Sequence, residues 1–309
     1  MNYPYANGII KAIENNILDY SKFQKLVSIS KKEFIKTLID LGYGAPHAKT
    51  LEELINLELQ KTKVLLSEIS PNKNLTDLFY FQNDAVNIKF FYKRKIFNVM
   101  QFDTFVGIGT ISRDTLEEVI INEDLSNLTK DLAKIFKDIN KAIENLDSPR
   151  LISSKIDQII YKYIFGKINR SPALVTYYSS KVDFTNVLIF LRSKKLRWDE
   201  NEFIEMFVPG GQISHKVFST AFSKDEKELI KLFEPFYNEK ISKGLAKFGS
   251  DLNHLERYFD ELIIEIMKSF SFDSFDIGPM IYYFLLKQAE AQNLRIIYAT
   301  SDIDSLLRY

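Results

Sequence analysis

Hydrophobic residues recur along this chain at the three- and four-residue spacing of amphipathic helices. Residues 150–168 and 250–272 show the spacing best, and a third long run covers residues 50–69. Apolar residues at this spacing form a stripe on one side of a helix, which is usually buried in the protein's own core. The alternative is a seam for a partner helix. The stripes are Ile152, Ile156, Ile159, Ile160, Tyr163 and Ile164, and Leu252, Leu255, Phe259, Leu262 and Ile266.

Local signals place further helices and leave little room for strands. Residues 8–18 carry isoleucines at helical spacing and predict an N-terminal helix. Thr50 can cap the long helix that follows, with Glu52 and Glu53 in its first turn, where the helix dipole favours acids. Clean alternation of apolar and polar residues is missing, and glycine-containing hairpin turns are few. The sequence therefore predicts an all-α fold.

A short helical signature appears three times. In each copy an acidic residue is followed three positions later by Asn, then by an aliphatic residue and a bulky apolar pair. A proline precedes each copy, and a long helical run precedes each proline. The copies cover residues 84–94, 183–192 and 290–298. The acid–amide pairs are Asp84 and Asn87, Asp183 and Asn186, and Glu290 and Asn293, and the prolines are Pro71, Pro172 and Pro279.

The signature places polar side chains beside an apolar face. At about 100° per residue, the acid, the amide and the apolar residues one and four positions after the amide share one side of a helix. A buried polar group left unpaired costs about 1–3 kcal/mol, so we expect both side chains to bond to a neighbouring helix or loop. The pair would then be structural. The alternative is that three acids meet at a threefold axis to bind a cation or a basic partner.

The spacing of the repeats is that of domains. Asn186 lies 99 residues after Asn87, and Asn293 lies 107 residues after Asn186, whereas solenoid repeats are about 20–50 residues long. The octapeptides FVGIGTIS at 105–112 and FVPGGQIS at 207–214 recur at a similar offset, and each ends in a serine that can cap a helix. We interpret the two octapeptides as the joints between the first and second domains and between the second and third domains. The sequence thus predicts three similar helical domains, at residues 1–110, 111–212 and 213–309.

Composition narrows the possible functions. Of 309 residues, 46% are hydrophobic, which is enough for real cores. Lysine plus arginine and aspartate plus glutamate number 41 each, so the chain lacks the basic excess typical of nucleic-acid binding. Cysteine is absent, which excludes disulfides and thiolate chemistry. No secretory signal and no apolar run long enough to span a membrane is found.

Motifs for catalysis or cofactor binding are missing. His47, His215 and His254 are far apart in sequence and lie in no metal-ligand spacing. Phosphate-binding loops, dinucleotide fingerprints and nucleophile elbows are absent, and the acid pairs stand in predicted first helical turns. We therefore predict no catalytic residue, no cofactor and no metal.

Two basic runs remain as candidate contacts for a partner. Each continues from a signature helix, at residues 89–95 and 192–197. Cations are favoured at helix C-termini, which explains such runs structurally. An acidic protein partner is the functional alternative, and nucleic acid is the weaker one. The candidate contacts are Lys93, Arg94, Lys95, Arg192, Lys194, Lys195 and Arg197.

Taken together, these motifs resemble the C subunits of the prokaryotic V-type/A-type ATP synthases, whose eukaryotic counterpart is the d subunit of the V-ATPase. The likeness covers essentially the whole chain. It rests on the opening segment from Tyr5 to Leu18, where Lys11 replaces the commoner arginine, on FVPGGQIS, on the C-terminal stretch 282–298 and on the repeated signature.

The resemblance implies a function that composition does not. Members of this family arrange three similar helical domains with pseudo-threefold symmetry as a funnel. They act as a non-catalytic central-stalk (rotor) subunit that links the central shaft to the membrane rotor ring and transmits torque for H⁺ or Na⁺ transport or ATP synthesis. The implied partners are the shaft and ring subunits. The implied location is the cytoplasmic face of the cell membrane, reached only through the ring.

Two other interpretations compete with this one. A stand-alone helical scaffold would bind soluble partners and never meet a rotor. A helical hydrolase or transferase would need a pocket that joins Asp84, Asp183 or Glu290 to solvent, with shifted pKa values.

Overall fold

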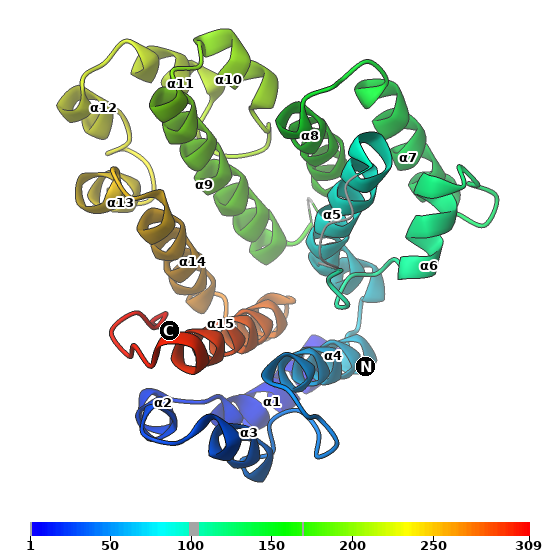
Figure 1. Ribbon diagram of the computed structural model, residues 1–309, viewed down its shortest axis with the longest axis vertical. Helices are drawn as coiled ribbons and strands as arrows, with labels where there is room; N and C mark the ends of the chain where they lie inside the picture. The colour runs from blue at the N-terminus through cyan, green and yellow to red at the C-terminus, as the bar shows by residue number, and fades with distance from the viewer. Residues whose placement is uncertain (1, 99–104, 169) are drawn as a thin grey trace. The chain divides into compact units, whose positions relative to one another are not determined.

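Every regular element in the described part of the chain is helical (Figure 1). The structure, a computed structural model, describes residues 2–98, 105–168 and 170–309. Over these ranges the prediction of an all-α fold is confirmed. The helices are α1 Tyr3–Ile13, α2 Tyr20–Val27, α3 Lys31–Asp40, α4 Leu51–Ile69, α5 Lys73–Phe97, α6 Arg113–Leu116, α7 Lys130–Ile143, α8 Pro149–Ile168, α9 Pro172–Leu196, α10 Glu200–Met206, α11 His215–Phe222, α12 Glu226–Leu232, α13 Lys240–Phe248, α14 Leu252–Lys268 and α15 Gly278–Thr300, with short turns of other helical type at Glu14–Asn16 and Glu117–Ile121.

The chain divides into two compact units. Unit 1 combines Met1–Phe79 with Ile264–Tyr309, and unit 2 comprises Tyr80–Ile263. Helices α5 and α14 each run through a boundary between the units. Unit 1 is therefore built from the two ends of the described chain.

In unit 1, helix α15 packs against α1, α2 and α4 (Figure 1). Aromatic side chains join α15 to two further helices: Phe34 of α3 meets Tyr298 and Phe79 of α5 meets Phe284, with ring centroids 5.3 and 5.6 Å apart. Edge-to-face pairs of this kind add about 0.5–1.5 kcal/mol to the burial of the rings. Helix α15 is the centre of this unit.

In unit 2, α8 packs against α7, α9 and α10, and α12 packs against α11 and α13. Phe190 of α9 lies among four other phenylalanines, with ring centroids 5.0–6.4 Å away. These neighbours are Phe203, Phe218, Phe222 and Phe233. This aromatic cluster joins α9, α10, α11 and the end of α12.

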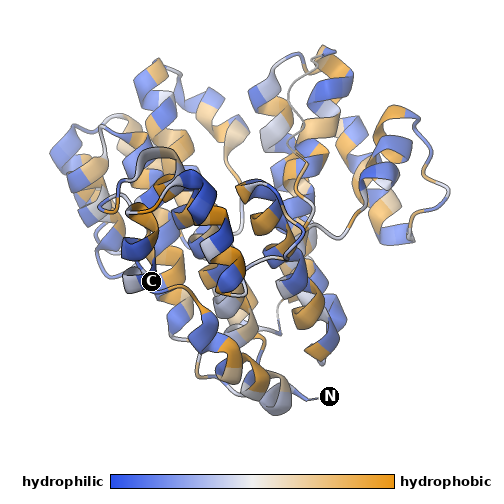
Figure 2. Cartoon of the chain, turned by 60° about the horizontal axis from the view of Figure 1, so that its bottom comes forward, coloured by the Kyte–Doolittle hydropathy of each residue, from blue (hydrophilic) through white to orange (hydrophobic). Residues whose placement is uncertain are grey.

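Most helices show hydrophobic and hydrophilic residues on different sides (Figure 2). On α8 the stripe predicted from the sequence is core, because Ile152, Ile156, Ile160 and Ile164 are all buried. On α14, Leu255, Phe259 and Leu262 are likewise buried. The interpretation of the stripes as core is confirmed for these seven residues, whereas Ile159, Tyr163, Leu252 and Ile266 are only half-buried.

Helix ends follow their capping residues. Thr50 caps α4, as the sequence predicted, and Glu53 completes a capping box with it. The predicted helix over residues 8–18 is wrong at both ends, because Asn2 caps α1 ahead of a favourable proline and the helix closes at Ile13. Helix α14 also ends at Lys268, before the predicted residue 272.

Candidate functional site

The amide of each repeated signature holds a loop. Asn87 on α5 donates from Nδ2 to the Val106 carbonyl (3.0 Å) and accepts the Val106 N–H at Oδ1 (2.8 Å). Asn186 on α9 makes the same reciprocal pair with Val208 (2.8 and 2.9 Å). In doing so, one side chain satisfies both backbone groups of a loop residue. We call this arrangement, together with the acid described next, the helix–loop clamp.

The amide of the third copy makes the same reciprocal pair of hydrogen bonds as the first two. Asn293 on α15 donates to the Leu307 carbonyl (3.0 Å) and accepts the Leu307 N–H (2.7 Å). The loop residue follows the amide by 14 positions here, against 19 for Asn87 and 22 for Asn186. The chemistry of the clamp is therefore constant while the loop length varies.

The acid of each clamp accepts backbone N–H groups. Asp84 accepts the N–H of Thr110 at both carboxylate oxygens (2.8 Å each) and the N–H of Ile111 (2.9 Å). Asp183 accepts the N–H groups of Gln212 (2.8 Å) and Ile213 (3.0 Å). Such charge-assisted bonds are among the stronger hydrogen bonds in proteins. They fix the loop that begins the next helical segment.

Asp183 has a further partner that the sequence did not reveal. The Tyr237 hydroxyl donates to Asp183 Oδ2 at 2.6 Å. Tyr237 is the first of three consecutive left-handed residues, with φ of 54°, 50° and 62° at positions 237–239. Each costs about 1–2 kcal/mol in a residue other than glycine, so the bond to Asp183 helps to hold a strained turn. Burial raises the pKa of Asp183, although its three hydrogen-bond donors oppose that shift.

Glycine is required where the loop approaches the acid. A Cβ at Gly109 would clash with the Asp84 carboxylate, and a Cβ at Gly211 would clash with the Asp183 carboxylate. These are the glycines shared by the two octapeptides. Ser112 caps α6 by accepting the Thr115 N–H, whereas Ser214 precedes α11 without such a bond.

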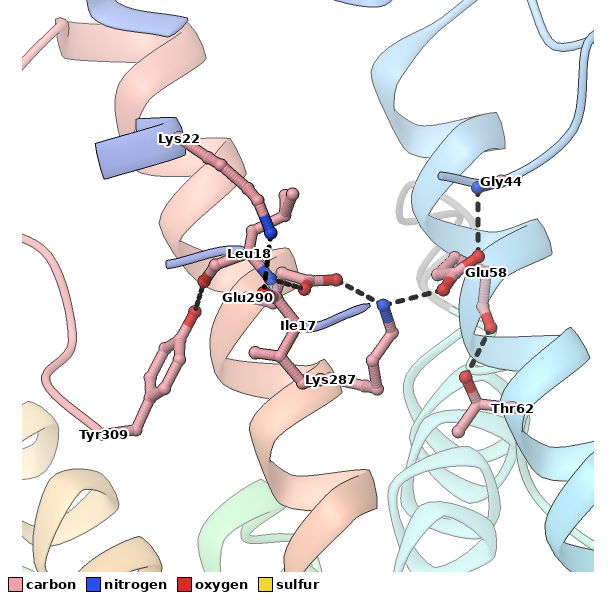
Figure 3. Close-up of polar contacts among 9 residues, drawn as sticks. All are labelled: Ile17, Leu18, Lys22, Gly44, Glu58, Thr62, Lys287, Glu290 and Tyr309. Atoms are coloured by element: carbon pink, nitrogen blue, oxygen red, sulfur yellow. Dashed lines mark hydrogen bonds and ion pairs between the residues drawn. The ribbon is translucent and has the colours of Figure 1, made fainter. Parts of the chain in front are cut away.

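The third acid lies in a buried charge cluster within unit 1 (Figure 3). Lys287 Nζ contacts Glu290 Oε1 at 2.6 Å and Glu58 Oε1 at 2.7 Å. The other oxygens of the two carboxylates accept the N–H groups of Leu18 (2.7 Å) and Gly44 (3.0 Å). This cluster ties α4 and α15 to the two loops that follow α1 and α3.

Electrostatics keep Lys287 charged. Lys287 is only 2% exposed, and burial by itself lowers the pKa of an ammonium group, but the charges of Glu290 and Glu58 outweigh it and raise the pKa of Lys287. Burial raises the pKa of Glu290, although Lys287 and the Leu18 N–H oppose the shift. The ring of Tyr43 lies 4.8 Å from the ammonium nitrogen. An ammonium group held in its charged form is not available as a nucleophile.

A pocket of about 300 Å³ opens next to the cluster, lined among others by Tyr43, Glu58, Thr62 and Lys287. The three signature acids have no exposed surface, and their oxygens are used by backbone, tyrosine or lysine donors. The hydrolase interpretation required access from solvent to these acids, and the structure does not provide it. Within the described residues, no group of acids and histidines is arranged to hold a metal ion.

The first basic run is largely paired within unit 2. Arg94 lies 3.7 Å from Glu117, and Lys95 lies 2.5 Å from Glu123. Burial, followed by the charge of Lys89, lowers the pKa of Lys93. Arg94 and Lys95 thus have partners inside the chain.

The second basic run contains both paired and exposed side chains. Arg192 pairs with Glu256 at 3.3 Å, and Lys194 donates to the carbonyls of residues 221, 222 and 224 at the end of α11. Lys195 and Arg197 are exposed, and neither forms an ion pair with a described residue. Arg197 ends α9 in the left-handed conformation with φ of 57°. Lys195 and Arg197 are therefore the candidates best placed to meet a partner.

The buried polar groups of this protein thus hold its own loops and helices together. Among the described residues every regular element is helical, and the three signature acids are closed to solvent. No described helix is both long enough and apolar enough to cross a membrane.

Comparison with known proteins identifies the family of this chain. The sequence profile of the family described as ATP synthase (C/AC39) subunit matches residues 6–300. The chain therefore belongs to this family, which confirms the resemblance seen in its motifs and the prediction of a structural role rather than a catalytic one.

Relatives of known identity extend over nearly the whole chain. The C subunit of the A-type ATP synthase of Thermococcus kodakarensis is 23% identical, over 95% of this chain and 85% of the relative. The C subunit from Thermococcus onnurineus is 26% identical, over 96% and 85%. That from Archaeoglobus fulgidus is 24% identical, over 96% and 91%.

Proposed function

We propose that this chain is the central-stalk subunit that links the shaft of a prokaryotic A-type or V-type ATPase to its membrane rotor ring. The match of the family over residues 6–300 carries this proposal. In this role the chain has no chemistry of its own. It transmits torque, so that ATP hydrolysis drives H⁺ or Na⁺ transport and the reverse flow drives ATP synthesis.

The internal bonding suits a part that transmits force. Three clamps fix loops to long helices through side chains that are entirely buried, namely Asn87, Asn186 and Asn293 with their acids. A net hydrogen bond contributes about 0.5–1.5 kcal/mol, and leaving such buried groups unpaired costs about 1–3 kcal/mol, so loosening a clamp is unfavourable. Stiffness of this kind limits the energy lost in elastic deformation.

We also propose that the three repeats, at residues 1–110, 111–212 and 213–309, are three similar domains around a pseudo-threefold axis that form a funnel for the shaft. The repetition of a long helix, a proline, a signature helix and a clamped loop supports this arrangement. The chain would lie at the cytoplasmic face of the membrane and reach it only through the ring, with no nucleic-acid partner.

Co-purification tests the proposal. A tagged full-length chain is expressed in its own host, membranes are extracted in mild detergent, and the captured subunits are identified by mass spectrometry. We expect both shaft and ring subunits. Capture of soluble proteins alone would contradict the proposal and favour the stand-alone scaffold.

Cross-linking tests the funnel. Because the chain has no cysteine, a single cysteine introduced on each signature helix gives an unambiguous reporter. The solvent-exposed Val86 on α5 is one such position. We expect cross-links from all three repeats to one shaft; cross-links from a single repeat would contradict the threefold arrangement.

A further inference from the structure

Two phenylalanines stand out from the surface of unit 1. Phe272 is 77% exposed and Phe275 is 80% exposed, and both lie in the segment 269–277 between α14 and α15. Among the described residues the next most exposed large hydrophobic side chain is Tyr5, at 58%. Exposed apolar groups that lie together mark interaction sites, whereas single ones need no explanation. We call residues 269–277 the aromatic loop.

The aromatic loop is held in a defined shape. Asn7 on α1 is buried and donates from Nδ2 to the carbonyls of Asp273 and Asp276, both at 3.1 Å. Inside the loop, the Phe275 N–H donates to Asp273 Oδ1 (2.9 Å) and the Ile277 N–H donates to Asp276 Oδ1 (2.7 Å). A preorganised loop loses little conformational entropy on binding. The backbone that carries the two rings is thus held in place.

Charge around the rings is acidic. The aromatic loop contains Asp273 and Asp276 and no lysine or arginine. Lys11 lies over the Phe272 ring at 4.7 Å, but its ammonium pairs with Glu14 at 2.7 Å. Lys268 precedes the loop at the end of α14. The surface that fits the loop is therefore an apolar groove with a rim of lysine or arginine.

We propose that the aromatic loop docks this chain onto the cytoplasmic side of a membrane-embedded protein, with Phe272 and Phe275 in an apolar groove. This inference rests on the proposed function. Cytoplasmic loops of membrane proteins carry an excess of lysine and arginine, which complements the two aspartates. Aromatic side chains in desolvated pockets carry much of the energy of protein interfaces. Anionic lipid headgroups would repel the same aspartates, so the partner is protein rather than bilayer.

The position of the loop in one repeat only is consistent with such a partner. The corresponding connections of the other two repeats, residues 70–72 and 169–171, contain no aromatic residue in their sequence. A ring of identical subunits offers many equivalent grooves, and three equivalent loops could fill them together only if the spacing of the ring matched. A single loop fills one groove whatever the number of ring subunits. A single docking point thus avoids any mismatch of symmetry.

The experiment compares the binding of purified ring and purified shaft to the full-length chain. The variant Phe272→Ser with Phe275→Ser removes both rings. The matched control, Leu41→Ser with Val64→Ser, removes two side chains of unit 1 that are 48% and 52% exposed. Circular dichroism and thermal unfolding verify that each variant is folded. We expect the loop variant to bind the ring about tenfold more weakly or worse, with shaft binding unchanged and the control like wild type.

The aspartates provide a second measurement. Asp273→Asn with Asp276→Asn keeps the oxygens that accept the loop N–H groups and removes both charges. We expect slower association with the ring and a weaker dependence on salt.

Other outcomes overturn the inference in distinguishable ways. If the wild-type chain binds neither ring nor shaft, the proposed function itself fails. If wild type binds both and the loop variant loses the shaft or loses nothing, the aromatic loop is not the membrane-side contact, and the proposed function stands. Equal loss in the control also overturns it. Loop-dependent binding to vesicles of anionic lipid without protein would assign the loop to the bilayer instead.

Discussion

At the scale of single residues, the third clamp differs from the first two. Glu290 replaces the aspartates, and its carboxylate is shared between the Leu18 N–H and Lys287. Lys287 is also paired with Glu58, so one ammonium lies between two buried carboxylates. Removing one member of such a group leaves uncompensated charge in a poorly solvated place, which costs far more than removing an exposed charge. Lys287 is the member whose removal leaves the most uncompensated charge, because both carboxylates lose their ammonium partner.

We expect Lys287→Met to lower the free energy of unfolding by about 3–5 kcal/mol at pH 7. The control is Lys61→Met, which removes an exposed lysine of the same unit and should change it by less than about 0.5 kcal/mol. Urea denaturation followed by circular dichroism measures both. Equal effects of the two substitutions would show that the cluster contributes no more than a surface charge.

The stability lost in the Lys287→Met variant should depend on pH, and the direction of that dependence can be stated. The pKa of Lys287 is raised in the folded protein, so the stability that it contributes is present below the ordinary lysine pKa near 10.5 and is lost as the pH rises through the folded value. In the Lys287→Met variant the two carboxylates face each other, and protonating one of them relieves their repulsion. The deficit of the variant should therefore shrink between pH 7 and pH 5. A deficit independent of pH would contradict this account.

At the scale of elements, the repeated unit is a long helix, a proline, a signature helix and a clamped loop. Gly109 and Gly211 are part of that unit, because they let the loop backbone approach the acid. The third repeat needs no such glycine, since Glu290 reaches the backbone of Leu18 rather than a following loop. The glycine that the two octapeptides share thus has a steric cause.

We expect Gly109→Ala and Gly211→Ala each to destabilise the protein by at least about 1–3 kcal/mol, because the added methyl displaces the acid from its backbone donors. Gly166→Ala is the control. Gly166 lies in α8 with open space around its Cβ position, so alanine should stabilise the helix by about 0.5–1 kcal/mol. Thermal unfolding distinguishes the expected destabilisation from the expected stabilisation. Stabilisation by Gly109→Ala or Gly211→Ala would contradict the steric role.

Much at this scale could be predicted from sequence, since helices depend on local periodicity and capping. Residues 50–69 and 150–168 are helical nearly to the residue. The partners of polar side chains are not local. Glu290 bonds to a residue 272 positions away, and Tyr237 reaches Asp183 across 54 positions, and no spacing rule encodes either contact. Lys287 three residues before Glu290 was visible as an ion-pair spacing, but its burial was not.

At the scale of the whole molecule, the second basic run contains both a side chain that bonds within the chain and side chains proposed to contact a partner. Lys194 is used by the carbonyls at the end of α11, whereas Lys195 and Arg197 project from the end of α9 without ion pairs to described residues. The three side chains are close in sequence and differ in role. Substitutions at the last two therefore test binding alone.

We expect Lys195→Glu with Arg197→Glu to weaken binding to shaft or ring about two- to tenfold at low salt, because each exposed charge contributes about 0.2–1 kcal/mol. The difference should fade as salt increases. Lys137→Glu with Lys141→Glu on α7 is the control for net charge and should leave binding unchanged. Titration calorimetry at two salt concentrations measures the effect, and unchanged affinity at low salt would remove these residues as contacts.

The discontinuity of unit 1 has a consequence for biosynthesis. A ribosome makes the helices of residues 1–79 first, but the segment 264–309 that completes their packing is made last. At roughly 5–20 residues per second, the faces of α1, α2 and α4 that await α15 stay uncovered for roughly ten to fifty seconds. Unit 2 is continuous in sequence and faces no such delay. The nascent amino-terminal helices are therefore the part of this protein with the greatest need of a chaperone.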